Sequence, residues 1–252
     1  MLPRGIVAGY AFCVVVIAGI DLAWSGRYPT GFCALEVGDD GTRLMELRCE
    51  TRRAEGVLEW LNGLGENVLA AIDAPLIATA ERRAEAAMAR VYGRQGVFAY
   101  AARPAFLEAK GINEGPRLGR LLSEIGWSLD PADVGSHPRV ALEVFPHAIT
   151  VALLGAERTL RYKKGRLVDR AAALEAFREL LRGHWSGLGM GECADLNQAV
   201  FSGTRRDLKD REDRLDALAC ALAAHHAWRF GFGEDEVFGD AANGYIAVSR
   251  RR

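Results

Sequence analysis

Two apolar segments that each end in an aspartate constrain the fold of this chain most strongly. Residues 12–21 read FCVVVIAGID and residues 67–73 read NVLAAID, so each run stops at an acidic residue. A continuous apolar run is typical of a strand that is covered on both faces of a sheet. An unpaired carboxylate there would cost several kcal/mol, so Asp21 and Asp73 either belong to a site or open a loop as turn or cap residues.

The rest of the pattern predicts an α/β protein. Residues 32–37 and 43–48 read as strands joined by an Asp-Asp-Gly turn, so with residues 12–21 they form an antiparallel meander. Helical patterns cover residues 51–64, 80–90, 115–127, 170–182 and 211–230, and further strands are expected at residues 140–145 and 245–248. This order indicates a mixed sheet, with a three-stranded antiparallel meander plus parallel strands, and with helices on both faces.

Composition excludes several classes of protein. The 252 residues are 50% hydrophobic and 26% charged, which is typical of a globular chain with a sizeable core. Five cysteines without C-x-x-C spacing argue against a disulfide framework and a zinc ribbon. We expect one domain over residues 1–252, with residues 1–10 as an N-terminal extension. Residues 92–116, rich in Gly, Pro, Arg and aromatic side chains, are expected to form a substrate or insertion loop.

The apolar run at residues 6–20 resembles a signal peptide, but it has no A-x-A-like cleavage site. It is also shorter than the roughly 20 residues that span a bilayer. We therefore expect a cytoplasmic protein with no membrane partner. The sequence leaves the oligomeric state open, and a homodimer is one of the states it allows.

A third acidic element lies near the start of the last helix. Asp213 and Asp216 are three residues apart, so they share one helix face, and Asp216 shares its stripe with small apolar residues. Carboxylate oxygens are the ligands that Mg²⁺ prefers, and two such ions about 4 Å apart can activate water and stabilise the leaving oxygen of a phosphodiester. The alternative is that these acids only favour the helix N-terminus through its dipole. The predicted metal ligands and catalytic acids are Asp21, Asp73, Asp213 and Asp216.

Two further residues lie in the segment ALEVFPH. Glu143 is either an additional metal or base residue or a buried structural acid bonded to an arginine, and it is kept among the catalytic candidates. His147 follows a proline at an expected helix start, which favours a capping or surface histidine.

Two basic runs, at residues 158–166 and 205–211, could contact a phosphate backbone, although each could also be a solvated loop. The candidate substrate-binding residues are Lys163, Lys164, Arg166, Arg205 and Arg206. The net charge of −1 provides no overall attraction to nucleic acid, and no aromatic stacking platform can be identified. The type of nucleic acid stays open.

Five short blocks occur in a recognisable order. They are GIDLAWSG at 19–26, AIDAPL at 71–76, EVFPHA at 143–148, YKKGR at 162–166 and DRLDALACALAAH at 213–225. Together they resemble a bacterial and archaeal family of predicted nucleases called domain of unknown function 429, over about residues 14–248. The helical D-x-x-D-A-L-A also resembles the end of RuvC-type Holliday-junction resolvases.

The resemblance implies a ribonuclease-H-like fold. It implies that Asp21 is the acid of the first strand, that Asp73 is the acid of the fourth strand, and that Asp213 and Asp216 are the helical acids. One departure concerns the segment after AIDAPL, where an Arg-x-Cys-Asp-like motif is expected and Arg82-Arg83-Ala84-Glu85 is found instead.

The leading functional hypothesis is a Mg²⁺- or Mn²⁺-dependent nuclease that uses a two-metal mechanism. One alternative is a noncatalytic ribonuclease-H-like scaffold or nucleic-acid-binding protein. Another is an ATP-dependent phosphotransferase of the actin-like fold, which usually needs two such domains and glycine-rich phosphate loops.

Overall fold

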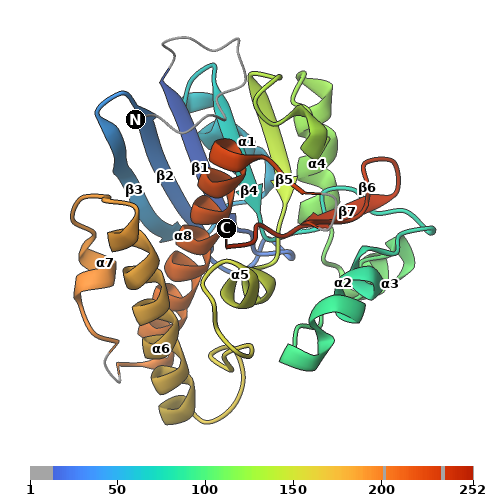
Figure 1. Ribbon diagram of the computed structural model, residues 1–252. Coiled ribbons are helices and arrows are strands. Elements are labelled where there is room, and N and C mark those ends of the chain that lie inside the picture. The colour runs from blue at the N-terminus through green and yellow to red at the C-terminus, as the bar shows by residue number, and fades with distance from the viewer. Residues whose placement is uncertain (1–13, 201–202, 234–235, 252) are drawn as a thin grey trace.

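A mixed sheet lies at the centre of the computed structural model, which describes residues 14–200, 203–233 and 236–251 (Figure 1). Within residues 14–200 the sheet has five strands in the order β3-β2-β1-β4-β5. Their bounds are Val15–Asp21 (β1), Thr30–Gly38 (β2), Gly41–Glu50 (β3), Val68–Ile72 (β4) and Arg139–Glu143 (β5). Strands β1 to β3 pair antiparallel, whereas β1, β4 and β5 pair parallel. The predicted meander plus parallel strands is confirmed, and the expected N-terminal extension lies outside the described residues.

Helices cover both faces of this sheet. One face carries α5 (Pro146–Ala152), α6 (Leu167–Gly187) and α8 (Arg205–Phe230), with α7 (Ala194–Asn197) beside α6. The other carries α1 (Ala54–Gly63) and α4 (Glu114–Glu124). The two sets of buried side chains alternate along β1, with Ile17 facing α8 and Ala18 facing α1 and α4. Because both faces are covered, β4 is apolar throughout and β1 is apolar up to its last residue, Asp21.

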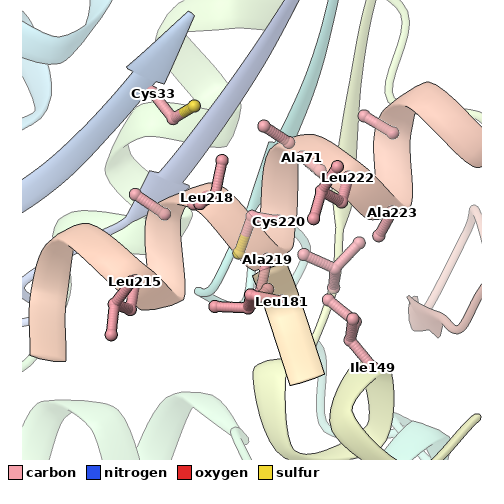
Figure 2. Close-up of a cluster of buried hydrophobic side chains, with 14 of the residues drawn as sticks. Cys33, Ala71, Ile149, Leu181, Leu215, Leu218, Ala219, Cys220, Leu222 and Ala223 are labelled. Carbon is pink, nitrogen blue, oxygen red and sulfur yellow. The ribbon is translucent and has the colours of Figure 1, made fainter. Parts of the chain in front are cut away.

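The long helix α8 lies across the strands, and Figure 2 shows its apolar side chains among Cys33 of β2, Ala71 of β4 and Leu181 of α6. The helix begins at Arg205, earlier than the residue 211 expected from the apolar pattern. A capping box explains this start, because the Thr204 hydroxyl accepts from the Asp207 N–H and the Asp207 carboxylate accepts from the Thr204 N–H.

Smaller elements lie on the β5 side of the sheet (Figure 1). They are α2 (Ala84–Tyr92), the 3₁₀ turns Gly93–Gln95 and Pro131–Asp133, α3 (Pro104–Lys110), β6 (Val237–Asp240) and β7 (Gly244–Ala247). The predicted terminal strand is therefore present, but it pairs with β6 in a separate two-stranded sheet. No helix in residues 14–200, 203–233 and 236–251 has the length and apolarity that a membrane crossing needs.

Two glycines let α8 approach the sheet closely. A Cβ atom on Gly19 of β1 would lie 2.1 Å from the backbone oxygen of Ala217, and one on Gly31 of β2 would lie 2.0 Å from that of Asp213. Since these atoms belong to backbone, no side-chain rotation can relieve the overlap. The absence of a side chain at both positions therefore sets the depth at which the acidic turn of α8 lies against β1.

Gly19→Ala is expected to lower the free energy of unfolding by about 1–3 kcal/mol, because an added methyl group would force α8 away from β1. Urea denaturation followed by circular dichroism measures the change. Gly183→Ala in α6 is the matched control, because Gly183 is exposed and its added Cβ meets nothing within 4 Å. That change should be neutral or stabilise the helix by about 0.5–1 kcal/mol. Equal effects of the two variants would contradict the close-approach explanation.

Candidate active site

The ends of two neighbouring parallel strands bring the first two predicted acids together. Asp21 is the last residue of β1, and Asp73 directly follows β4. The two chains stay paired to this point, since the Asp73 N–H donates to the Ile20 oxygen at 2.8 Å. The two carboxyl groups lie close enough for the like charge of Asp21 to raise the pKa of Asp73. This edge of an open α/β sheet, beyond the carboxyl ends of its strands, is where ligands commonly bind.

The helix α8 supplies the other two acids. Asp213 lies close enough to Asp21 for the Asp21 charge to raise its pKa, and Asp216 follows almost one turn later on the same face. All four aspartates are at most 8% exposed, and Asp216 is fully buried. The structure therefore brings Asp21, Asp73, Asp213 and Asp216 into one buried group from three separate elements.

Two lysines supply positive charge to this group. The ammonium group of Lys163 lies 2.9 Å from Asp216 Oδ2 and 3.7 Å from Asp73 Oδ2. Lys209 forms ion pairs with Asp213 and with Glu212. Both are less buried than the acids that they contact, with Lys163 30% exposed and Lys209 43% exposed.

A buried tyrosine orients the innermost acid. The Tyr162 hydroxyl donates to Asp216 Oδ1 at 2.7 Å, and its ring stacks on Phe177 with the centroids 4.9 Å apart. No role was predicted for Tyr162 from the sequence. The only signal was its place at the start of the YKKGR block, directly before Lys163.

Crowding raises the pKa values of these acids. Burial, and then the like charge of Asp21, raises the pKa of Asp213 to about 8, against the opposing effect of Lys209. Burial likewise raises the pKa of Asp216 to about 6, although Lys163 opposes the shift. The pKa of Asp73 is also raised well above its usual range, chiefly by burial. Full ionisation of the group therefore requires added positive charge.

Asp21→Asn is expected to stabilise the metal-free protein more at pH 8 than at pH 5, by about 1 kcal/mol or more. A carboxyl whose pKa is higher in the folded state binds its proton more tightly there, so its contribution to stability falls as pH rises. For Asp213 this loss occurs between its ordinary pKa of 3.8 and its folded-state pKa of about 8. Removing the Asp21 charge lowers the pKa of its neighbours and weakens this loss. Urea denaturation in EDTA at the two pH values measures the difference. A gain that is the same at pH 5 and pH 8 would argue against coupling of the acids.

The chemistry of this group fits a hard divalent cation, because every donor is a carboxylate oxygen. Asp216 Oδ2 is also a buried oxygen without a hydrogen-bond donor, and its contact is the ion pair with Lys163. As the side chains stand, no three His, Cys, Asp or Glu groups within the described residues are arranged to hold a metal ion. The ammonium groups of Lys163 and Lys209 lie beside the carboxylates instead. A bound divalent cation would therefore replace the contact that Lys163 makes with Asp216.

Glu143 ends β5 opposite Ile72 of β4, and it lines the same cleft as Asp21 and Asp73. Its two oxygens accept hydrogen bonds from Arg82, and one of them also accepts from the Leu76 N–H at 3.2 Å. Burial raises the pKa of Glu143 to about 8, while Arg82 opposes the shift. This geometry favours a structural acid bonded to an arginine over a metal ligand.

The predicted basic residues divide between two places. Lys163 and Lys164 line the cleft, whereas Arg166 pairs with the exposed Asp169. Arg205 and Arg206 are exposed in the first turn of α8 and do not line the cleft. The structure thus separates the two basic runs that appeared equivalent in the sequence.

His147 differs from the surface or capping histidine expected for it. It lies in the first turn of α5 and lines the cleft, and its buried Nδ1 has no hydrogen-bond partner among the described residues. Burial, and then the charge of Lys163, lowers its pKa to about 3, so the imidazole is neutral at physiological pH.

Two members of the four-acid group, Asp21 and Asp73, line a cleft of about 1450 Å³. Asp21, Asp73 and Lys163 line one part of it, and aromatic side chains line another. The aromatic lining residues are Trp24, Tyr28, Phe98, Tyr100, Phe106 and Phe145. Sequence analysis identified no aromatic platform, because these residues come from distant segments without a common period. The region predicted as a substrate loop, residues 92–116, contributes several of them.

A mixed sheet ordered β3-β2-β1-β4-β5, with acids at the ends of β1 and β4 and on α8, defines a protein of the ribonuclease-H-like fold class. The chain belongs to the family described as protein of unknown function DUF429, which matches residues 19–239. Among solved structures, T. thermophilus RuvC in complex with Holliday junction substrate is similar over 85% of this chain and 97% of that chain. The identity is 17% and the TM-score 0.34, so this likeness assigns no activity. A comparison with curated proteins finds no match.

Proposed function

We propose that this protein is a divalent-metal-dependent nuclease that hydrolyses phosphodiester bonds of nucleic acid. The observation that carries the proposal is the group of four buried aspartates from β1, the end of β4 and α8, of which Asp21 and Asp73 line a large cleft. Burying four carboxylates together is costly unless cations balance them. A purely structural core would gain nothing from such a group beside a solvent-filled cleft.

Asp21, Asp73, Asp213 and Asp216 would hold Mg²⁺ or Mn²⁺. When bound, such ions supply an activated water and stabilise the charge on the leaving oxygen. The residues of the chain hold this site in place: Tyr162 fixes the orientation of Asp216 through its hydroxyl, and the Gly19 and Gly31 contacts set the position of α8.

Lys163 would contact both the substrate and the four-acid group. Its side chain is 30% exposed, so it reaches both the acids and the cleft. A substrate phosphate entering the cleft offers the ammonium group a second anionic partner. Lys163 then neutralises substrate charge at the point where the acids would otherwise repel it.

A noncatalytic scaffold is the second candidate, and one observation favours it. Lys163 and Lys209 already contact three of the four aspartates, so the group has partial charge balance without metal. In that case the ion pairs would be structural, and millimolar Mn²⁺ would leave the stability of the protein unchanged.

A nuclease panel tests the proposal. Single-stranded, duplex, hybrid and branched substrates are incubated with the full chain in Mg²⁺, Mn²⁺ or EDTA, and Mn²⁺ binding is measured by calorimetry. We expect Mn²⁺ binding and cleavage of at least one substrate with metal, and none in EDTA. No cleavage of any substrate together with no Mn²⁺ binding at millimolar metal would overturn the proposal in favour of the scaffold.

A further inference from the structure

The cleft beside the four aspartates presents aromatic rings to solvent. Tyr28 is 66% exposed, Phe98 is 67% exposed and Tyr100 is 62% exposed. Four aromatic side chains are exposed within the described part of the chain, and three of them line this one cleft. Leaving a large apolar ring in water forgoes favourable burial, so their concentration in one place calls for a ligand that covers them.

Tyr100 is held as a flat platform next to a cation. Its ring stacks on Phe106 with the centroids 5.9 Å apart and an interplanar angle of 21°. The Lys164 ammonium lies 5.8 Å from the centroid of the Tyr100 ring and 3.4 Å from its hydroxyl. A planar, supported ring with an adjacent positive charge suits a nucleotide, because the base can stack while the phosphate meets the ammonium.

Further cations line the cleft without acidic partners. Arg27, Lys110 and Arg161 all line it, and none of them pairs with a carboxylate of the described residues. The two glutamates in the lining, Glu85 and Glu143, are both bonded to Arg82, so they do not neutralise these cations. Outside the four-acid group, the unpaired charge of the cleft is therefore positive and matches a phosphate backbone.

We infer that this cleft binds unpaired nucleotides, so that the substrate is a single strand or a single-stranded segment, with Tyr28, Phe98 and Tyr100 as stacking residues. In a duplex the faces of the bases are covered by their neighbours, so exposed rings can stack only on bases that are not paired. As a statement about the substrate of the nuclease this rests on the proposed function, whereas the binding itself does not require cleavage.

Binding is measured by fluorescence anisotropy with the full chain in EDTA, using labelled single strands of DNA and of RNA and the matching duplexes. We expect tighter binding of at least one single strand than of its duplex. Tyr100→Ala and Phe98→Ala are each expected to weaken single-strand binding about 10-fold, and Tyr100→Phe is expected to preserve it. Phe230→Ala is the matched control, because Phe230 is 41% exposed but does not line the cleft.

Duplex binding as tight as single-strand binding, or unchanged binding by both alanine variants, would overturn the inference. Other results distinguish failure of the proposed function from failure of this inference. If single strands bind through the aromatic residues but no metal-dependent cleavage occurs, the inference holds and the nuclease is rejected. If duplex cleavage proceeds unchanged in Tyr100→Ala and Phe98→Ala, the nuclease holds and the inference is rejected.

Discussion

Replacing Asp216 by Asn is expected to lower metal-dependent cleavage roughly 10³-fold while the protein stays folded. The amide keeps an oxygen that can accept the Tyr162 hydrogen bond of 2.7 Å, so the local packing survives. It removes the negative charge and one of the two oxygens with which a carboxylate holds a divalent cation. Initial cleavage rates at saturating Mn²⁺, on whichever substrate of the panel is cut, measure the effect.

The matched control is Asp40→Asn, since Asp40 is an exposed acid in the turn between β2 and β3. This variant should cleave at the wild-type rate. Circular dichroism and urea denaturation establish that Asp216→Asn is folded before its rate is interpreted. If a folded Asp216→Asn retains more than about a tenth of the wild-type rate, Asp216 is not a metal ligand in the reaction.

Replacing Arg82 by Met is expected to lower the free energy of unfolding by about 3–5 kcal/mol, the range for breaking a buried ion pair. Arg82 is 1% exposed and donates to Glu85 and Glu143 and to the Ile77 oxygen. Without the guanidinium, two buried carboxylates lose the group that balances them. Urea denaturation at pH 9, above the pKa of about 8 of Glu143, measures the loss.

Arg83→Met is the matched control, because Arg83 is the neighbouring arginine and is exposed. Its effect on stability should be within about 0.5 kcal/mol of zero. The double variant Arg82→Met with Glu143→Gln should recover part of the loss, since it removes one uncompensated charge. A loss below about 1 kcal/mol for Arg82→Met would mean that the carboxyl groups are neutral when folded.

The arginine–glutamate cluster also gives the segment after the AIDAPL block a structural role in this chain. Arg82 and Glu85, from the segment whose role the sequence left open, form ion pairs that tie α2 to the end of β5 through Glu143. Glu85 and Glu143 both line the cleft, so this cluster forms part of the cleft surface.

The sheet and the four aspartates could be predicted from local patterns. An apolar run that ends in an acid predicts both a central strand and a functional strand end, and β1 and β4 follow this pattern. The helical spacing of Asp213 and Asp216 places them on one face whatever the helix packs against. The helix α7 was not predicted, and α5 was expected only as a helix start at Pro146, because four and seven residues are too few to display a helical period.

The tertiary structure sets which charged side chains and aromatic rings lie near the acids. Lys163 and Arg166 belong to the same basic block, but only Lys163 reaches the aspartates, since the chain turns into α6 after Gly165. Likewise, Glu143 ends an apolar strand as Asp21 does, yet Arg82 neutralises it.

The sequence by itself determined the five strands of the main sheet, the longer helices and the candidate acids, because these depend on residue type and local spacing. The five ordered blocks also resembled the family whose model matches residues 19–239. Only the tertiary structure decided that Lys163 balances those acids and that Tyr28, Phe98 and Tyr100 line one cleft with them. The physical reason is that ion pairing and stacking depend on distances in space. Those distances are set by how closely α8 packs on the five-stranded sheet and α2 packs on β6 and β7, and no local pattern in the chain encodes them.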